Sequence, residues 1–230
     1  SKMFSINAGV YFGLKGKSNG EIAALSRSQH KCQGFGTMGT RGDEIEYLES
    51  QSKIGESYSD GKDRYGWRNP IRKDTGTLLK SMVIAHKPSN ILEIGTAHGL
   101  SALYLVDGFN DDVGQKLDTI DFDLDVSTST QSRMDRLNVP VTVHFGDALE
   151  VFPKLNNRYE MVFFDAQKNL YLTQLKSLIH LNLVGNGTVV LADNVLDRKS
   201  ECQTFLDWFQ ENDINHNIIQ TECGLLVARL

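Results

Sequence analysis

From residue 71 to residue 230, short apolar runs alternate with segments of helical periodicity. The runs are rich in β-branched and aromatic residues and predict strands at Asn90–Ile94, Lys116–Asp121, Val141–Phe145, Tyr159–Phe164, Thr188–Ala192, Asn215–Gln220 and Leu225–Arg229. The segments between them predict helices at Thr77–His86, Leu100–Asp107, Ser127–Leu137, Ala148–Leu155, Leu170–His180 and Lys199–Glu211. Strands that alternate with helices are typical of right-handed βαβ units, so we expect an α/β fold with a doubly wound, mostly parallel sheet. Only Thr221–Gly224 separates the last two strands, which predicts that the final strand is antiparallel.

The N-terminal part of the chain lacks this alternation. Gly, Ser, Lys and Gln interrupt it throughout, and within it only Glu44–Ile54 has the pattern of a helix. We therefore predict an N-terminal extension over residues 1–70, partly irregular, and a folded domain over residues 71–230.

Composition narrows the class of protein. With 40% hydrophobic and 23% charged residues over 230 positions, the chain is typical of a globular protein and not of a disordered or collagen-like one. No apolar run reaches the roughly 20 residues that span a bilayer, and the N-terminus lacks the apolar core of a signal peptide. Cys32, Cys202 and Cys223 are too scattered for a disulfide framework or a metal motif, which favours free thiols in a reducing compartment. We therefore expect a cytoplasmic protein with no membrane partner.

Charge is unevenly distributed along the chain. The net charge of −5 combines +5 over residues 1–90, which hold 14 basic and 9 acidic residues, with −10 over residues 91–230, which hold 10 and 20. The basic first segment could face an anionic partner or be an ordinary solvated surface. Because the isoelectric point is about 5.7 and no platform of interleaved aromatic and basic residues is present, the sequence does not favour a nucleic-acid partner.

Polar residues follow five of the predicted strands at the point where each strand ends. They are the loop Glu93–Gly99, Asp121, Asp147, Asp165 and the pair Asp193–Asn194. Any one of these acids could be a helix cap or a turn residue. Because ligands of doubly wound sheets bind beyond the carboxyl ends of the strands, the residues together predict a polar ligand site.

The spacing of these residues outlines a ligand that contains adenosine. The E-x-G-x-x-x-G loop over Glu93–Gly99 allows a tight turn and a close approach of the ligand to a helix N-terminus. Asp121 can bind both ribose hydroxyls, and Asp147 can accept a hydrogen bond from an adenine amino group. No GxxxxGK[ST] loop occurs, so a phosphate cradle of the ATPase type is not supported.

Several of these segments carry a family resemblance. ILEIGTAHGLSAL, Asp121 and GDALE together resemble the class I S-adenosylmethionine-dependent methyltransferases. YEMVFFDAQKNLY followed by GTVVLADNV is similar to the metal-dependent O-methyltransferases, the group that includes catechol and caffeoyl-CoA O-methyltransferases. The resemblance covers residues 71–230 and implies a Rossmann-like fold of seven strands, S-adenosylmethionine as cofactor and a bound divalent metal.

The resemblance also implies roles for individual residues. The cofactor would be held by Glu93, Gly95, Thr96, Gly99, Ser101, Asp121, Asp147, Ala148 and Asp165. The metal ligands would be Asp165, Asp193 and Asn194, and Lys168 would be the catalytic base. Two carboxylates and an amide oxygen suit Mg²⁺, with Mn²⁺ or Ca²⁺ as alternatives, and disfavour zinc. From the residues alone, a surface lysine at the start of a helix is the favoured interpretation of Lys168.

The implied function is transfer of a methyl group from S-adenosylmethionine to a hydroxyl of a small phenolic, catechol-like or biosynthetic metabolite. Two alternatives stay open: methylation of a hydroxylated tRNA base, and cofactor binding without catalysis. Gln167 stands where the family often has an aromatic residue, and we cannot place the family's acidic substrate residue near the C-terminus. Tyr65–Lys73 could fold over the site with Trp67 and Arg68 touching the substrate, or form a surface linker. Relatives are often homodimers, but no interface can be read from this sequence.

Overall fold

A seven-stranded sheet organises the protein. The computed structural model describes residues 39–51, 70–110 and 114–230. Its strands are β1 (Asn90–Ile94), β2 (Lys116–Asp121), β3 (Val141–Phe145), β4 (Met161–Phe164), β5 (Val189–Ala192), β6 (His216–Ile219) and β7 (Leu225–Arg229). They lie in the order β3-β2-β1-β4-β5-β7-β6, in which β7 runs opposite to the other six strands. The predicted fold class and the antiparallel last strand are confirmed.

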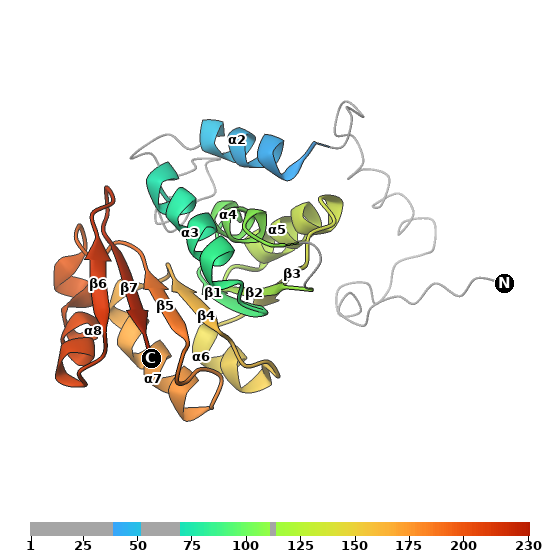
Figure 1. The fold of residues 1–230 in the computed structure, drawn as a ribbon. Helices are drawn as coiled ribbons and strands as arrows, with labels where there is room; N and C mark the ends of the chain where they lie inside the picture. Colours follow the sequence, from blue (N-terminus) through green and yellow to red (C-terminus); the bar gives the residue numbers. More distant parts are fainter. Residues whose placement is uncertain (1–38, 52–69, 111–113) are drawn as a thin grey trace. The chain divides into compact units, whose positions relative to one another are not determined.

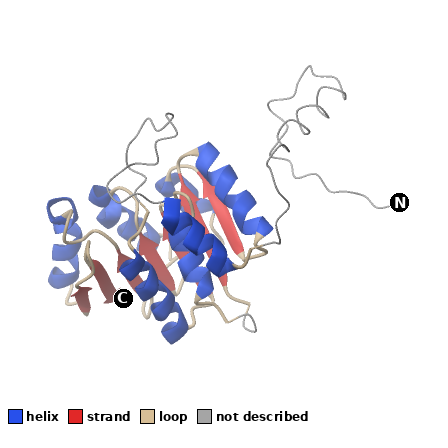
Figure 2. Cartoon of the chain, turned by 90° about the horizontal axis from the view of Figure 1, so that it is seen from above, coloured by secondary structure: helices blue, strands red, loops and turns tan. Residues whose placement is uncertain are grey.

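Two sets of helices cover the two faces of this sheet (Figures 1 and 2). On one face lie α2 (Arg41–Gln51), α3 (Lys73–His86), α4 (Leu100–Asp107) and α5 (Leu124–Arg136). On the other lie α6 (Ala148–Val151), α7 (Tyr171–His180) and α8 (Lys199–Glu211). Two short 3-10 helices, η3 (Phe152–Lys154) and η4 (Lys168–Leu170), follow α6 and precede α7.

Several element boundaries differ from the sequence-based expectation. Helix α3 starts at Lys73 and not at Thr77, and α7 starts at Tyr171 and not at Leu170. The helix expected over Ala148–Leu155 divides into α6 and η3, because Pro153 has no N–H to donate to a helical hydrogen bond. Helix α5 starts at Leu124 and not at Ser127, because Asp123 caps it by accepting a hydrogen bond from the Val126 N–H at 3.0 Å. The helix expected over Glu44–Ile54 is α2, which starts three residues earlier, at Arg41; its last described residue is Gln51.

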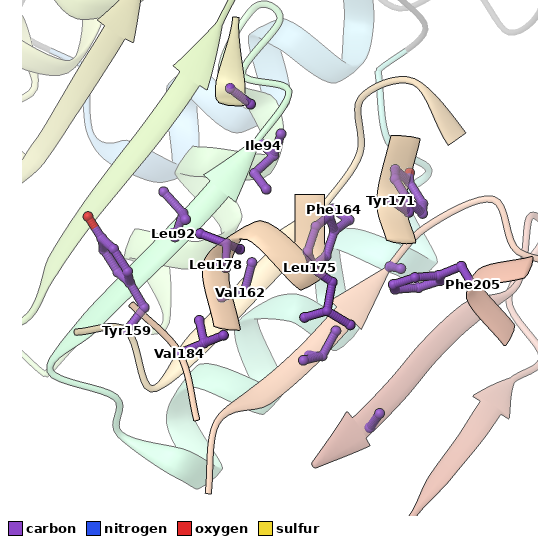
Figure 3. Packing of buried hydrophobic residues seen from close by; sticks show 14 of the residues in the cluster. Leu92, Ile94, Tyr159, Val162, Phe164, Tyr171, Leu175, Leu178, Val184 and Phe205 are labelled. Atoms are coloured by element: carbon purple, nitrogen blue, oxygen red, sulfur yellow. The ribbon is translucent and has the colours of Figure 1, made fainter. Parts of the chain in front are cut away.

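The strands are buried on both faces, as a sheet covered by helices requires. Alternate residues of the central strands face opposite layers: Phe163 of β4 belongs to the core beneath α3–α5, and Phe164 to the core beneath α6–α8. In the second core, Phe164 packs against Tyr171 and Phe205 with ring centroids 5.5 and 5.7 Å away (Figure 3). The tilted rings have the offset geometry that aromatic side chains prefer.

The compact unit to which the sheet belongs runs from Gly39 to Leu230, so it includes α2. The sequence-based boundary near residue 70 left α2 in the extension. The role of the remaining extension as a possible lid stays a prediction, because residues 1–38 and 52–69, with Trp67 and Arg68, lie outside the described residues. Cys202 and Cys223 are buried free thiols, and Cys32 is likewise outside. No helix in the described part of the chain is both long and apolar enough to cross a membrane.

The contact between α3 and α4 depends on a glycine. Gly76 of α3 is buried, and a Cβ built on it would lie 2.4 Å from ring atoms of Tyr104 in α4. Gly42, near the start of α2, is exposed, and a Cβ there meets only the Thr40 hydroxyl oxygen, at 3.6 Å.

We expect Gly76→Ala to lower the free energy of unfolding by about 1–2 kcal/mol, because the overpacking cost of about 1–3 kcal/mol exceeds the gain of up to about 1 kcal/mol in helix propensity. Gly42→Ala is the matched control and should raise the same quantity by a few tenths to about 1 kcal/mol. Urea unfolding of the two variants measures both effects. Equal changes in both variants would contradict the packing argument.

Candidate active site at the carboxyl edge of the sheet

Most of the polar residues singled out from the sequence gather at one edge of the sheet. β1, β2, β4 and β5 run parallel, so their carboxyl ends meet there. The loop Gly95–Gly99 follows β1, Asp121 ends β2, Asp165 follows β4, and Asp193–Asn194 follows β5. The predicted common edge is therefore present.

The glycine loop passes directly over the chain that follows β4. Gly95 has φ +104°, and a Cβ on it would lie 2.6 Å from the Asp165 carbonyl oxygen. Gly99 has φ +83° where it begins α4, and a Cβ on it would lie 2.7 Å from Met134 and 2.8 Å from Thr130, both in α5. Only glycine meets both demands without strain or displacement. The loop is thus pressed between Asp165 on one side and α5 on the other.

Asp121 holds the glycine loop from the end of β2. Its carboxylate accepts hydrogen bonds from the backbone N–H of Ala97 at 2.9 Å and of Asp123 at 3.0 Å. The Asp121 side chain therefore links the end of β2 to the glycine loop and to the start of the segment that leads into α5. Its contact with ribose hydroxyls stays a prediction.

Glu93 lies beneath the loop and is fully buried. The Thr119 hydroxyl donates to its carboxyl at 2.5 Å. Burial raises the pKa of Glu93 to about 8, against the opposing effect of hydrogen bonds from Ser101 and Thr119. Glu93 is therefore mostly neutral at pH 7 in the folded protein.

A pair of buried acids lies at the ends of β4 and β5. Burial, and then the charge of Asp165, raise the pKa of Asp193 to about 7. Burial also raises the pKa of Asp165, although the nearby Lys168 ammonium opposes that effect. The Thr75 hydroxyl of α3 lies 3.4 Å from Asp193 Oδ1. Burial and mutual repulsion disfavour the state in which both acids are ionised. A cation bound between them would favour that state, so the pair is a candidate cation site.

Lys168 supplies one positive charge to this pair. Its Nζ lies 2.8 Å from Asp165 Oδ1, and its side chain is only 13% exposed. The same Nζ lies 5.5 Å from the centroid of the Tyr171 ring. The alternative of a solvated surface lysine therefore does not describe its environment.

Asn194 directly follows Asp193 in the loop after β5. Its backbone has φ +66°, a left-handed conformation that Asn tolerates better than most residues. Its side-chain Nδ2 donates to Asp197 at 3.3 Å. Asp147, by contrast, caps α6 by accepting from the Leu149 N–H at 2.8 Å. That is the cap role considered for it from the sequence, and its contact with adenine stays a prediction, as does that of the buried Ala148.

The oxygen donors of this site fit a hard divalent cation. Asp165 and Asp193 supply two carboxylates and Asn194 an amide, which is the oxygen chemistry that Mg²⁺ prefers. A divalent cation would also hold both acids ionised despite their burial. No group of three or more His, Cys, Asp or Glu side chains that could hold a metal occurs among the described residues, so a metal at this pair of acids would need a ligand of another kind.

Sequence reasoning missed Thr75 and Tyr171. Thr75 is fully buried and lies 118 positions before the Asp193 that it contacts. Tyr171 is fully buried beneath Lys168, and its hydroxyl lies 3.4 Å from the Asp193 carbonyl oxygen. No local pattern marks Thr75, because it reaches the site through packing between elements distant in sequence. Tyr171 ends the motif YEMVFFDAQKNLY, three residues after Lys168, so its position in that motif was the available signal.

Comparison with known proteins decides the family. The sequence profile of the family described as O-methyltransferase matches residues 60–204. The chain belongs to the O-methyltransferase family. Catechol O-methyltransferase of Bos taurus is 32% identical over 148 residues, which cover 61% of this chain and 53% of the relative. Catechol O-methyltransferase of Sus scrofa is 31% identical over 133 residues, or 55% of this chain and 70% of the relative. The chain spans about half the length of the bovine and mouse relatives.

Solved O-methyltransferase structures share the fold. One from Bacillus cereus, in complex with SAH, has a TM-score of 0.65 at 20% identity and covers 91% of this chain and 97% of its own. One from Streptomyces achromogenes, involved in tomaymycin synthesis and in complex with SAM, has a TM-score of 0.65 at 23% identity, with 91% and 96% covered. The predicted Rossmann-like architecture and the predicted family are both confirmed.

The buried Glu93 makes stability depend on pH. Its folded-state pKa of about 8 exceeds the ordinary 4.5, so the folded state binds the proton more tightly than the unfolded state. Its contribution to stability is complete below about pH 4.5 and declines as pH rises to about 8. We expect Glu93→Gln to remove this contribution, so wild type should lose stability relative to the variant between pH 5 and pH 8.

Urea unfolding at a series of pH values checks this expectation. Glu211→Gln, at the exposed end of α8, controls for the loss of a carboxylate elsewhere. Parallel stability profiles for wild type and Glu93→Gln would contradict the assigned pKa.

Proposed function

We propose that the protein transfers a methyl group from S-adenosylmethionine to a hydroxyl of a small molecule and that it requires a divalent metal. One observation carries the proposal: the glycine loop after β1 abuts the Asp165 backbone, while the Asp165 side chain is paired with Lys168. Asp165 therefore contacts the proposed cofactor loop through its backbone and Lys168 through its side chain. Relatives named catechol O-methyltransferase, and solved neighbours that hold SAM or SAH, support the same function.

The cofactor would be bound along the loops after β1 and β2. In this proposal Gly95, Thr96, Gly99 and Ser101 hold its methionine part, with Glu93 as support beneath the loop, and Asp165 borders the loop from the β4 side. Asp121, which holds the glycine loop from the end of β2, binds the ribose hydroxyls. Asp147 and Ala148, at the start of α6, contact the adenine.

The metal would be held by Asp165, Asp193 and Asn194. When bound, the metal would supply a Lewis acid that favours ionisation of the substrate hydroxyl, and S-adenosylmethionine would supply the electrophilic methyl group. The protein orients the hydroxyl toward the methyl group and excludes water from the site, so catalysis depends on position and electrostatics without a covalent enzyme intermediate. Lys168, fixed by Asp165 and Tyr171 at the margin of the acid pair, would accept the proton from the hydroxyl as the neutral amine, a form that a cation bound at Asp165 would favour over the ammonium.

A small hydroxylated acceptor is the substrate class that we propose. The acid pair suits an acceptor with two neighbouring oxygens, such as a catechol or another vicinal diol, because both oxygens could approach one cation. Gln167 replaces the frequent aromatic residue beside Lys168, so a simple catechol is one candidate among several.

The cofactor site is tested by calorimetry. We expect wild type to bind S-adenosylhomocysteine and Asp121→Ala to bind it more weakly by about 1.5–3 kcal/mol, the range for hydrogen bonds to a charged group. Asp135→Ala, on the exposed side of α5, is the matched control and should keep wild-type affinity. Unchanged affinity in Asp121→Ala would refute the ribose role.

The metal site is tested by separating binding from turnover. We expect Asp193→Asn to bind S-adenosylhomocysteine like wild type but to lose Mg²⁺-dependent methylation of catechols and other vicinal diols by at least about 10²-fold, because the charge that holds the metal is gone. Asp213→Asn is the control, since its left-handed backbone at φ +53° suits Asn and it lies in the turn after α8. Full activity of Asp193→Asn, or wild-type activity that survives EDTA, would overturn the metal role.

A further inference from the structure

The outer side of the glycine loop is held by two side chains of α5. The Thr130 hydroxyl donates to the Ala97 carbonyl at 3.0 Å, and Arg133 Nη1 donates to the His98 carbonyl at 2.9 Å. These two carbonyls belong to consecutive residues of the loop. The conformation of the loop therefore depends on where α5 presents its side chains.

Arg133 is shared between the loop and α2. Its Nε donates to Glu44 Oε1 at 2.7 Å, across 89 positions of sequence. The Arg133 side chain is 19% exposed and that of Glu44 is 14% exposed. Solvent screens such a pair less than a surface pair, so the contact is stronger than an ordinary surface salt bridge.

The shape of the guanidinium group joins these two contacts. Its nitrogens lie in one rigid plane, so an acceptor bound at Nε fixes the direction in which Nη1 points. Glu44 thereby sets the orientation from which Arg133 reaches the His98 carbonyl. Lysine could not hold both partners in this way, because its ammonium is a single point on a flexible stem.

We propose that α2 is a brace for the cofactor loop and that Glu44 and Arg133 are positioning residues for S-adenosylmethionine binding. The proposal rests on the proposed function, in which this loop binds the cofactor. Without Glu44, the Arg133 guanidinium is no longer held in one orientation, so the His98 carbonyl loses a constant donor. The loop is then less ordered in the free protein, and cofactor binding has to order it at a cost in free energy. Cofactor affinity then depends on a helix that lies outside the cofactor site.

Other contacts of α2 provide a contrast. Arg136 Nη2 donates to the same Glu44 carboxylate at 3.0 Å, but the Arg136 side chain is 55% exposed and no contact between it and the loop is recorded. Arg41 Nη1 donates to the Val106 carbonyl near the end of α4 at 2.8 Å. The Arg136 contact attaches α2 to α5, and the Arg41 contact attaches it to α4, so a variant at Arg136 separates loss of attachment from loss of the brace.

The test is calorimetric titration of S-adenosylhomocysteine into the full 230-residue chain. The set comprises wild type, Arg133→Gln, Glu44→Gln, the double variant and the control Arg136→Gln. We expect dissociation constants about tenfold higher for Arg133→Gln, about threefold to fivefold higher for Glu44→Gln, and within twofold of wild type for Arg136→Gln. The double variant should resemble Arg133→Gln, because the two residues act in series.

Thermal unfolding of each variant without ligand separates the brace from a purely structural role. A structural role would lower the unfolding temperature and leave the dissociation constant of folded protein unchanged. That result, additive effects in the double variant, or equal loss of affinity in Arg136→Gln would overturn the proposal. If Arg133→Gln does not fold, Glu44→Gln and Arg136→Gln decide by the same comparison, since Gln at position 44 has nearly the size of Glu but lacks the charge that holds Arg133.

The two proposals fail differently. Wild type that is folded but does not bind S-adenosylhomocysteine would overturn the proposed function and the brace together. Wild type that binds it, with Arg133→Gln folded and equally tight, would overturn the brace alone and leave the proposed function intact.

Discussion

The parallel pairing of β1 with β2 on one side and β4 on the other is the constraint on which the site depends. Ile94, the last residue of β1, pairs with Ile120 of β2 and with Phe164 of β4. The three strands therefore end next to one another at the carboxyl edge of the sheet, and the loop residues that follow them must fit into one small volume. Gly95 has no side chain because the Asp165 backbone occupies that space. The loop that we propose to bind the cofactor and the acid that we propose to bind the metal become neighbours through this steric requirement.

The same crowding explains the electrostatics of the site. Glu93, Asp165 and Asp193 are buried within one edge of the sheet, and burial raises the pKa of each. Lys168 offsets part of the repulsion through its ion pair with Asp165. An arrangement that disfavours ionisation of its own acids costs stability, and such a cost is common where a site is built to receive a cation or a proton. A divalent ion at these oxygens would relieve it.

Helices outside the site also contribute to it. Thr75 in α3 reaches Asp193, and Arg133 in α5 reaches both the glycine loop and Glu44 of α2. The layer of helices on this face is therefore more than a cover for the sheet. It carries the supports that hold the loops after β1 and β5, which is why we assign α2 a role in cofactor affinity.

The sequence by itself determined the succession of strands and helices along the chain, the family and the residues at the strand ends, because each depends on a local pattern. Apolar runs such as MVFF predict a strand that is buried on both faces, and an acid directly after such a run indicates the carboxyl end of that strand. Four of the seven strands begin and end where the pattern predicts, and the other three are shorter at one or both ends.

Tertiary structure alone decided that α2 joins the folded unit, that Lys168 is enclosed and that Arg133 connects α2 to the loop. The physical reason is the distance in sequence between the partners. Glu44 and Arg133 are separated by 89 positions, and their meeting depends on how α2, α4 and α5 pack together. No periodicity within either helix encodes that meeting.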